Sequence, residues 1–190
     1  MDVIEAIRSA GVVGAGGAGF PTHVKLGVTA QRVIINGAEC EPLLRVDQLS
    51  MQHQAQRMVR GLELAMEAAH APEGVIATKH HYEQAVEALN RAIAGKPNLR
   101  LHLMESYYPS GDEKNVIFEI TGQVVPTGKL PIDTGCVVIN VGTALNIADA
   151  VDGIPVTEKT VTVTGDVPEP MTVTVPIGVR MRRRTYIFLS

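Results

Sequence analysis

The chain has 190 residues, a formal net charge of −3 and 45% hydrophobic residues, enough for one full domain and part of a second. The net negative charge argues against nucleic acid or an anionic membrane as the main partner. The two cysteines, Cys40 and Cys136, are too few for a disulfide framework. No apolar run approaches the roughly 18 residues of a spanning helix, and the first residues do not resemble a signal peptide. The sequence therefore predicts a cytoplasmic protein with no direct membrane insertion.

Predicted helices and strands alternate through the first 151 residues. Short apolar runs predict strands at 32–36, 74–79, 99–103 and 136–141. Helical spacing of apolar residues predicts helices at 2–10, 46–70, 81–94, 112–122 and 143–151. This alternation is typical of βαβ units. We therefore expect an α/β fold, a Rossmann-like, mainly parallel sheet with helices on both faces.

The pattern changes after about residue 153. The segments TEKTVTVTGDV and MTVTVPIGV alternate Thr and Val with no helix between them, which predicts half-buried antiparallel strands. We expect a first domain at 1–154 and a small β-rich unit at 155–190. The second is too short for an independent core, so it is expected to be truncated or completed by another chain. The last ten residues break the alternation, and we expect residues 181–190 to be poorly ordered or held only by a neighbouring chain.

A glycine-rich loop at residues 11–19, after the first predicted helix, is the first candidate motif. Gly14, Gly16 and Gly19 fit G-x-G-x-x-G, Gly17 adds a fourth glycine, and Glu39 follows about 20 residues on. The first clear strand follows the loop instead of preceding it, so a plain structural turn explains the motif about as well. Glycines nevertheless let backbone N–H groups approach a planar or phosphorylated ligand closely.

Three polar motifs follow predicted strands, and ligands of open α/β sheets bind at the carboxyl ends of strands. They are NGAECEP at 36–42, YPSGDEK at 108–114 and INVGT at 139–143. Each has a simpler reading, because the first could be a solvated acidic turn and the other two could begin and cap helices. The third could equally donate to a phosphate.

The joint order of these motifs is more specific than any one of them. It resembles the flavin-binding domain of the complex I 51-kDa subunit and of RnfC, with GGAGFPTHVKL and NVGTA as matching segments. The resemblance covers roughly residues 5–180. Within that family, the NGAECEP segment and the short stretch before the glycine loop are most like the cobalamin reductases of propanediol utilisation, which belong to bacterial microcompartments.

The resemblance implies a cofactor-binding role for thirteen residues. Those expected to form the bed for FMN and to reach its phosphate are Gly14, Gly16, Gly17, Gly19, Lys25, Asn140 and Thr143. Asn36 and Glu39 are expected to bond the flavin and its ribityl chain. Asp112 stands where the family has a flavin-contacting Glu, and Glu113 matches the Glu beside it. Phe20 and Glu41 are expected on the NADH side. The chain departs from the family pattern at Asp112, one carbon shorter than the usual Glu, and at Ala38, which replaces an Asp.

The same resemblance implies the function. NADH would pass a hydride to flavin N5, with no side chain needed as a catalytic acid or base. Electrons would then leave through iron–sulfur clusters to cobalamin or a cobalamin-handling enzyme, near other microcompartment proteins. Those clusters need C-x₂-C-x₂-C runs, so we expect them in a further C-terminal part and no metal ligands in this chain. The Thr/Val-rich end resembles the start of an SLBB domain, a small β unit.

Two alternatives remain open at this point. One is an RnfC-type protein that feeds a membrane redox pump. The other is a docking fragment that keeps the fold without a flavin.

Overall fold

A computed structural model describes residues 2–180, which divide into two compact units. Within these residues, the larger unit comprises 2–40 and 47–156, and the smaller one 41–46 and 157–180.

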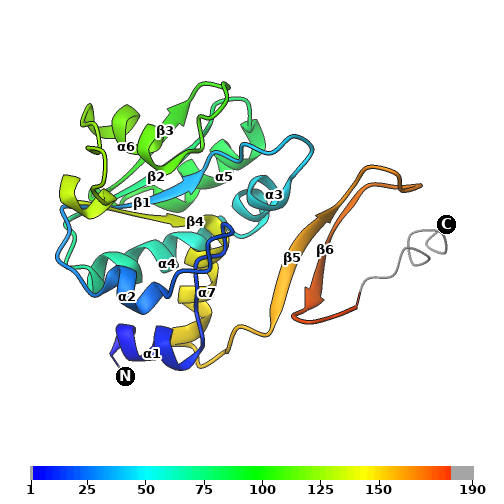
Figure 1. Ribbon diagram of the computed structural model, residues 1–190, viewed down its shortest axis with the longest axis horizontal. Helices are drawn as coiled ribbons and strands as arrows, with labels where there is room; N and C mark the ends of the chain where they lie inside the picture. Colours follow the sequence, from blue (N-terminus) through cyan, green and yellow to red (C-terminus); the bar gives the residue numbers. More distant parts are fainter. Residues whose placement is uncertain (1, 181–190) are drawn as a thin grey trace. The chain divides into compact units, whose positions relative to one another are not determined.

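A parallel sheet forms the centre of the larger unit (Figure 1). Its strands are β1 (Arg32–Gly37), β2 (Glu73–Lys79), β3 (Leu99–Met104) and β4 (Cys136–Asn140), in the order β3-β2-β1-β4. Every neighbouring pair is parallel, as the alternation of strands and helices predicts. The chain moves outward from β1 to β3 and then returns to place β4 on the other side of β1. This order creates a topological switch point between β1 and β4, where ligands of such sheets usually bind.

Helices cover both faces of this sheet, so the predicted fold class is confirmed. The helices are α1 (Val3–Ser9), α2 (Thr22–Leu26), α3 (Val46–His53), α4 (Ala55–Ala68), α5 (Glu83–Ile93), α6 (Glu113–Thr121) and α7 (Val141–Val151), with a short 3₁₀ turn, η1 (Pro131–Thr134). Alternate strand residues enter two separate cores. Val33 and Ile35 of β1 pack with α1, α4, α5 and α7, whereas Ile34 between them packs with α6.

The predicted helix 46–70 is two helices, which corrects the prediction. Gln54 leaves the helical conformation, with φ −126° and ψ 25°, and α4 begins at the next residue. The Gln54 side chain accepts a hydrogen bond from Nη1 of Arg57 at 2.6 Å. The apolar spacing continues through the break because both helices bury residues on the same core, and this is why the sequence pattern does not reveal it.

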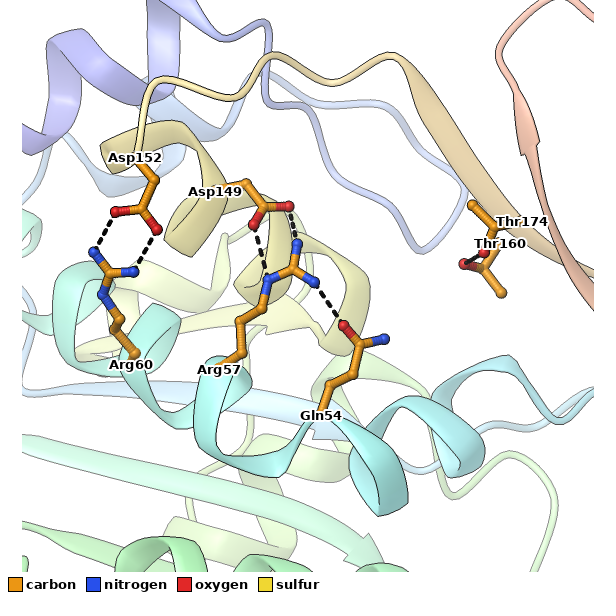
Figure 2. A network of polar contacts seen from close by, with 7 residues as sticks. All are labelled: Gln54, Arg57, Arg60, Asp149, Asp152, Thr160 and Thr174. Carbon is orange, nitrogen blue, oxygen red and sulfur yellow. Dashed lines mark hydrogen bonds and ion pairs between the residues drawn. The ribbon is translucent and has the colours of Figure 1, made fainter.

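Helices α4 and α7 approach each other unusually closely. A Cβ atom placed on Gly61 of α4 would lie 1.9 Å from the carbonyl oxygen of Ala144 in α7, so only glycine fits there. At the surface of the same contact, Arg57 bonds Asp149, and Arg60 forms a two-pronged pair with Asp152 at 2.6 and 2.7 Å (Figure 2). The close approach fixes the position of α7 against the rest of the larger unit.

The smaller unit contains a two-stranded antiparallel ribbon, as the Thr/Val alternation predicts. Its strands are β5 (Glu158–Val163) and β6 (Met171–Pro176). Thr160 faces Thr174 at 2.9 Å between hydroxyl oxygens, a pair drawn in Figure 2. Thr162 and Thr172 form a second such pair at 3.2 Å. The prediction for residues 181–190 lies outside the described residues.

No helix within residues 2–180 has the length and apolar character needed to cross a bilayer.

Candidate functional site

The carboxyl edge of the parallel sheet brings the predicted motifs of the larger unit together. Asn36 and Asn140 occupy the same register position at the ends of β1 and β4. They therefore mark the switch point of the sheet from its two sides. The glycine loop, the start of α7 and the loop after β3 all meet these two strand ends, as the following contacts show.

The glycine loop is tied to the start of α7. The backbone N–H of Ala15 donates to Oγ1 of Thr143 at 2.9 Å, and the N–H of Gly14 donates to the carbonyl of Phe20 at 2.9 Å, which closes the loop on itself. A Cβ on Gly16 would lie 3.4 Å from Cβ of Asn140. The loop therefore packs directly on the N-terminal turn of α7, where the helix dipole favours an anion.

Gly17 and Gly19 present an open surface in this loop. Gly17 has φ +126° and Gly19 φ +63°, backbone conformations that L side chains rarely adopt. No atom lies within 4 Å of where their Cβ atoms would stand, so both residues face open space. The next residue, Phe20, is 51% exposed. The loop thus offers bare backbone beside an exposed aromatic ring.

The loop after β3 is anchored to the end of β1. Asn36 Nδ2 donates to the carbonyl of Gly111 at 2.8 Å, and the N–H of Gly111 donates to Sγ of Cys40 at 2.9 Å. A Cβ on Gly111 would lie 1.9 Å from the carbonyl oxygen of Ala38. Glycine at 111 is therefore required for contact between these loops. In this arrangement Asn36 uses both its amide donor and its oxygen on the protein, because Oδ1 accepts the N–H of Ala38 at 3.1 Å.

Lys25 and Glu113 form a part-buried ion pair at the same edge. The Lys25 ammonium donates to Oε1 of Glu113 at 2.8 Å and keeps further donors for another acceptor. Asp112 acts as the N-cap of α6, since its Oδ1 accepts the backbone N–H of Lys114 at 2.9 Å. The capping role expected for this motif is therefore present.

Glu39 is the most perturbed carboxylate near the strand ends. Its Oε2 atom is buried and has no hydrogen-bond partner. Burial, and secondly the negative charge of Asp47, raise the pKa of Glu39 from 4.5 to about 7, while a backbone hydrogen bond from Asp47 and the charge of Lys79 act in the other direction. The Lys79 ammonium donates to the Glu39 backbone carbonyl at 2.5 Å. A buried carboxylate with an unused oxygen at a strand end is a candidate ligand contact.

Three residues at this edge were absent from the sequence-based prediction. Asp47 accepts a hydrogen bond from Asn140, Lys79 contacts Glu39, and burial together with the charges of Glu39, Asp47 and Cys40 raises the pKa of Tyr82. Lys79 ends a predicted strand, which is the signal that could have found it, whereas Tyr82 lay at the start of the predicted helix 81–94. Asp47 lay within a predicted helix and gave no such signal.

The structure thus brings together most of the predicted residues. The contacts above join the glycine loop, Lys25, Asn36, Asp112, Glu113, Asn140 and Thr143 with Glu39 within the larger unit. Glu41 belongs to the smaller unit, although it lies only two positions after Glu39. Within the described residues, no group of three or more His, Cys, Asp or Glu side chains could hold a metal ion.

Comparison with known families assigns the larger unit. Residues 7–149 match the Nuo51 FMN-binding domain of complex I 51-kDa type. The match covers the glycine loop, all four strands of the parallel sheet and most of α7. The chain therefore belongs to this family of FMN-binding domains, which are parts of electron-transfer oxidoreductases.

Curated relatives agree with this assignment. The chain is 50% identical over 182 residues to the cobalamin reductase PduS of Salmonella typhimurium, which covers 95% of this chain and 40% of the relative. It is 44% identical over 179 residues to a component of the Na(+)-translocating ferredoxin:NAD(+) oxidoreductase complex of Acetobacterium woodii, covering 91% of this chain and 40% of that protein. The chain thus spans about two fifths of the length of these relatives.

Solved structures show the same fold. A crystal structure of NAD+-reducing NiFe hydrogenase in the H2-reduced state aligns over 93% of this chain and 37% of its own, with a TM-score of 0.80 at 24% identity. The air-oxidised form gives a TM-score of 0.79 at 25% identity, over 93% of this chain and 36% of its own.

Proposed function

We propose that the larger unit binds FMN at the carboxyl edge of its sheet, between the glycine loop 14–19 and the turn 140–143. The observation that carries the proposal is the Ala15–Thr143 hydrogen bond, which places an open glycine loop on the first turn of an 11-residue helix. Backbone donors, a helix N-terminus and a nearby lysine suit a phosphorylated planar ligand. The family membership supports FMN as that ligand.

The residues present fit this cofactor. Gly14, Gly16, Gly17 and Gly19 would form the bed, since bare backbone at Gly17 and Gly19 leaves room for a flat ring. Asn140 and Thr143 would stand near the phosphate, with Lys25 supplying positive charge. The unpartnered Oε2 of Glu39 is available to the flavin or ribityl chain.

Asn36, Asp112 and Glu113 also lie at the edge of the proposed site, but their side chains already bond other parts of the protein. Asn36 holds the loop after β3, Asp112 caps α6, and Glu113 orients Lys25. We therefore propose that these three shape the flavin site chiefly by fixing its loops.

The electron donor is proposed to be NADH. Bound FMN would supply the redox chemistry by accepting a hydride from the nicotinamide, and the chain's own residues would bind and orient both partners. We propose Phe20 and Glu41 for the NADH side. Two kinds of relative support a nicotinamide partner, because their names describe a ferredoxin:NAD(+) oxidoreductase and an NAD+-reducing hydrogenase.

For the whole protein we propose a cobalamin reductase. The 50% identity to a cobalamin reductase exceeds the 44% identity to the ferredoxin:NAD(+) oxidoreductase component, which keeps the RnfC-type role as the second candidate. On this proposal, iron–sulfur clusters in a further part of the protein would carry electrons to cobalamin or a cobalamin-handling enzyme. The location would be the cytoplasm, in a bacterial microcompartment with its other proteins. The domain at 155–190 is proposed as part of an SLBB-like unit, following the FMN/NADH-binding domain at 1–154.

A flavin titration tests the proposed function and separates it from a flavin-free docking fragment. The purified chain is titrated into FMN while flavin fluorescence is followed, and absorbance is recorded after excess FMN is removed. We expect saturable fluorescence change and a retained yellow chromophore. A colourless protein with no saturable change would overturn the proposal. NADH added under anaerobic conditions should then bleach the flavin absorbance if the proposed donor is correct.

A further inference from the structure

A buried carboxylate at the start of α3 contacts the proposed flavin site. Asp47 is only 9% exposed, and a carboxylate so deeply buried is rarely left without a partner. Its Oδ2 accepts a hydrogen bond from Nδ2 of Asn140 at 2.7 Å, across 93 positions of sequence. Asp47 thus joins the N-terminal end of α3 to the end of β4.

This hydrogen bond selects one orientation of the Asn140 amide. An asparagine amide has an acceptor oxygen on one side and a donor NH₂ group on the other. Because the Asp47 oxygen accepts from Asn140 Nδ2, the NH₂ group faces Asp47. The Asn140 oxygen then faces α7, where it accepts the backbone N–H of Gly142 at 2.8 Å. The reversed amide would place NH₂ against an N–H and lose both bonds.

The Asn140 side chain lies beside the glycine loop. A Cβ on Gly16 would lie 3.4 Å from Cβ of Asn140, and a Cβ on Gly142 would lie 3.2 Å from Cβ of Ala15. The next residue, Thr143, holds the loop through Ala15. A change in the first turn of α7 would therefore move the surface on which the loop rests.

We propose that Asp47 is a positioning residue for the flavin site, acting through the Asn140 amide on the first turn of α7 and the glycine loop. It does not itself touch the cofactor in this proposal. The expected effect on FMN binding rests on the proposed function. The hydrogen bonds that link Asp47 to Asn140 and Asn140 to the Gly142 N–H form a relay that can be measured without the cofactor.

The test compares variants that separate the acceptor from the charge. Asp47→Ala removes the acceptor and should weaken FMN binding by more than about tenfold, comparable with the loss of a charge-assisted hydrogen bond. Asp47→Asn keeps an acceptor oxygen and should rescue binding to within about threefold of the parent. Asp149→Ala removes another part-buried carboxylate, one that pairs with Arg57 away from these contacts, and should leave FMN affinity unchanged.

A double-mutant cycle tests whether Asp47 acts through Asn140. If it does, Asp47→Ala should cost little further affinity in an Asn140→Ala background, since the relay is already broken. Fully additive losses would overturn the proposal, as would parent-like FMN affinity in Asp47→Ala.

Amide hydrogen exchange provides the readout that needs no flavin. The Gly142 N–H should exchange faster in Asp47→Ala than in the parent and return towards the parent rate in Asp47→Asn. If the parent protein binds no FMN, the proposed function fails, and unchanged Gly142 exchange in Asp47→Ala would separately refute the relay. If the Gly142 N–H exchanges faster in Asp47→Ala but the parent protein binds no FMN, Asp47 still positions Asn140, and its proposed role at a flavin site is refuted.

Discussion

The ammonium of Lys25 in α2 lies 2.8 Å from the Glu113 carboxylate at the start of α6, a contact between residues 88 positions apart. This pair brings a positive charge to the edge of the sheet and holds it there. In the proposed complex the same ammonium would also contact the flavin or its phosphate.

Lys25→Ala is therefore expected to weaken FMN binding by about 1.5–3 kcal/mol, the usual value of a hydrogen bond to a charged group. The measurement is a fluorescence titration with FMN. Lys96→Ala is a matched control, because Lys96 forms a lysine–glutamate pair with Glu63 whose exposed fractions, 34% and 39%, nearly equal the 33% and 38% of Lys25 and Glu113. Equal losses in both variants would contradict a phosphate role for Lys25.

Gly17→Leu should abolish or greatly weaken FMN binding because a large side chain would occupy the open surface of the glycine loop. The control is Gly95→Leu, since Gly95 also has positive φ and nothing within 4 Å of its missing Cβ. Both variants introduce backbone strain at an open position, but only the first lies in the proposed flavin bed. If Gly17→Leu binds FMN as well as Gly95→Leu does, the loop is only a turn and the site is misplaced.

Glu39 should make flavin binding depend on pH. Its pKa of about 7 lies above the ordinary value of 4.5, so the folded protein favours the protonated form, and stability should fall as pH rises from about 4.5 to about 7. A ligand that covers the unpartnered oxygen further favours the neutral acid. We expect affinity for riboflavin, which lacks the titrating phosphate, to decrease as pH rises through about 7.

Glu39→Gln should remove that pH dependence and should raise thermal stability at pH 8 relative to the parent. Riboflavin titrations at several pH values and thermal unfolding at pH 5 and pH 8 provide the two measurements. The same slope of affinity against pH in both proteins would assign the titration to another group.

Gly61→Ala should destabilise the larger unit by about 1–3 kcal/mol or more, although alanine ordinarily favours helix. The reason is the position of the new Cβ, 1.9 Å from the carbonyl oxygen of Ala144. Urea unfolding followed by circular dichroism measures the change. An increase in stability would show that α4 and α7 separate at little cost, contrary to the tight contact described above.

The strands were the most predictable part of this fold. The runs RVIIN and CVVIN are buried on both faces, so a continuous apolar stretch bounded by turn residues identifies them. Their polar ends then locate the site, because parallel strands place their carboxyl ends on one edge. This is why Asn36 and Asn140, far apart in sequence, could be predicted to lie together.

The contacts within the site were less predictable, for a physical reason. Asp47 is an acidic residue in the first turn of a helix, where acidic residues are common. The neighbouring sequence does not show whether such a residue is buried or exposed to solvent. Its burial and its bond to Asn140 arise only from tertiary packing. The break between α3 and α4 at Gln54 was also not predictable, because both helices bury residues in the same core and the apolar spacing continues across the break. Glu39 and Glu41 belong to different units because the chain leaves the larger unit after Cys40, and no sequence pattern marks that point.

The hydrogen bond from Ala15 to Thr143 has a consequence for synthesis on the ribosome. The donor is made near the beginning of the chain, and its acceptor follows 128 positions later. During that interval the glycine loop lacks the helix that it packs on. The contact between the glycine loop and α7 then closes a chain segment that spans most of the larger unit. The segments between them can pair as β1, β2 and β3 while translation proceeds. The proposed cofactor site is therefore completed last, when α7 emerges and docks, so a nascent chain should acquire flavin affinity only after Thr143 has left the exit tunnel.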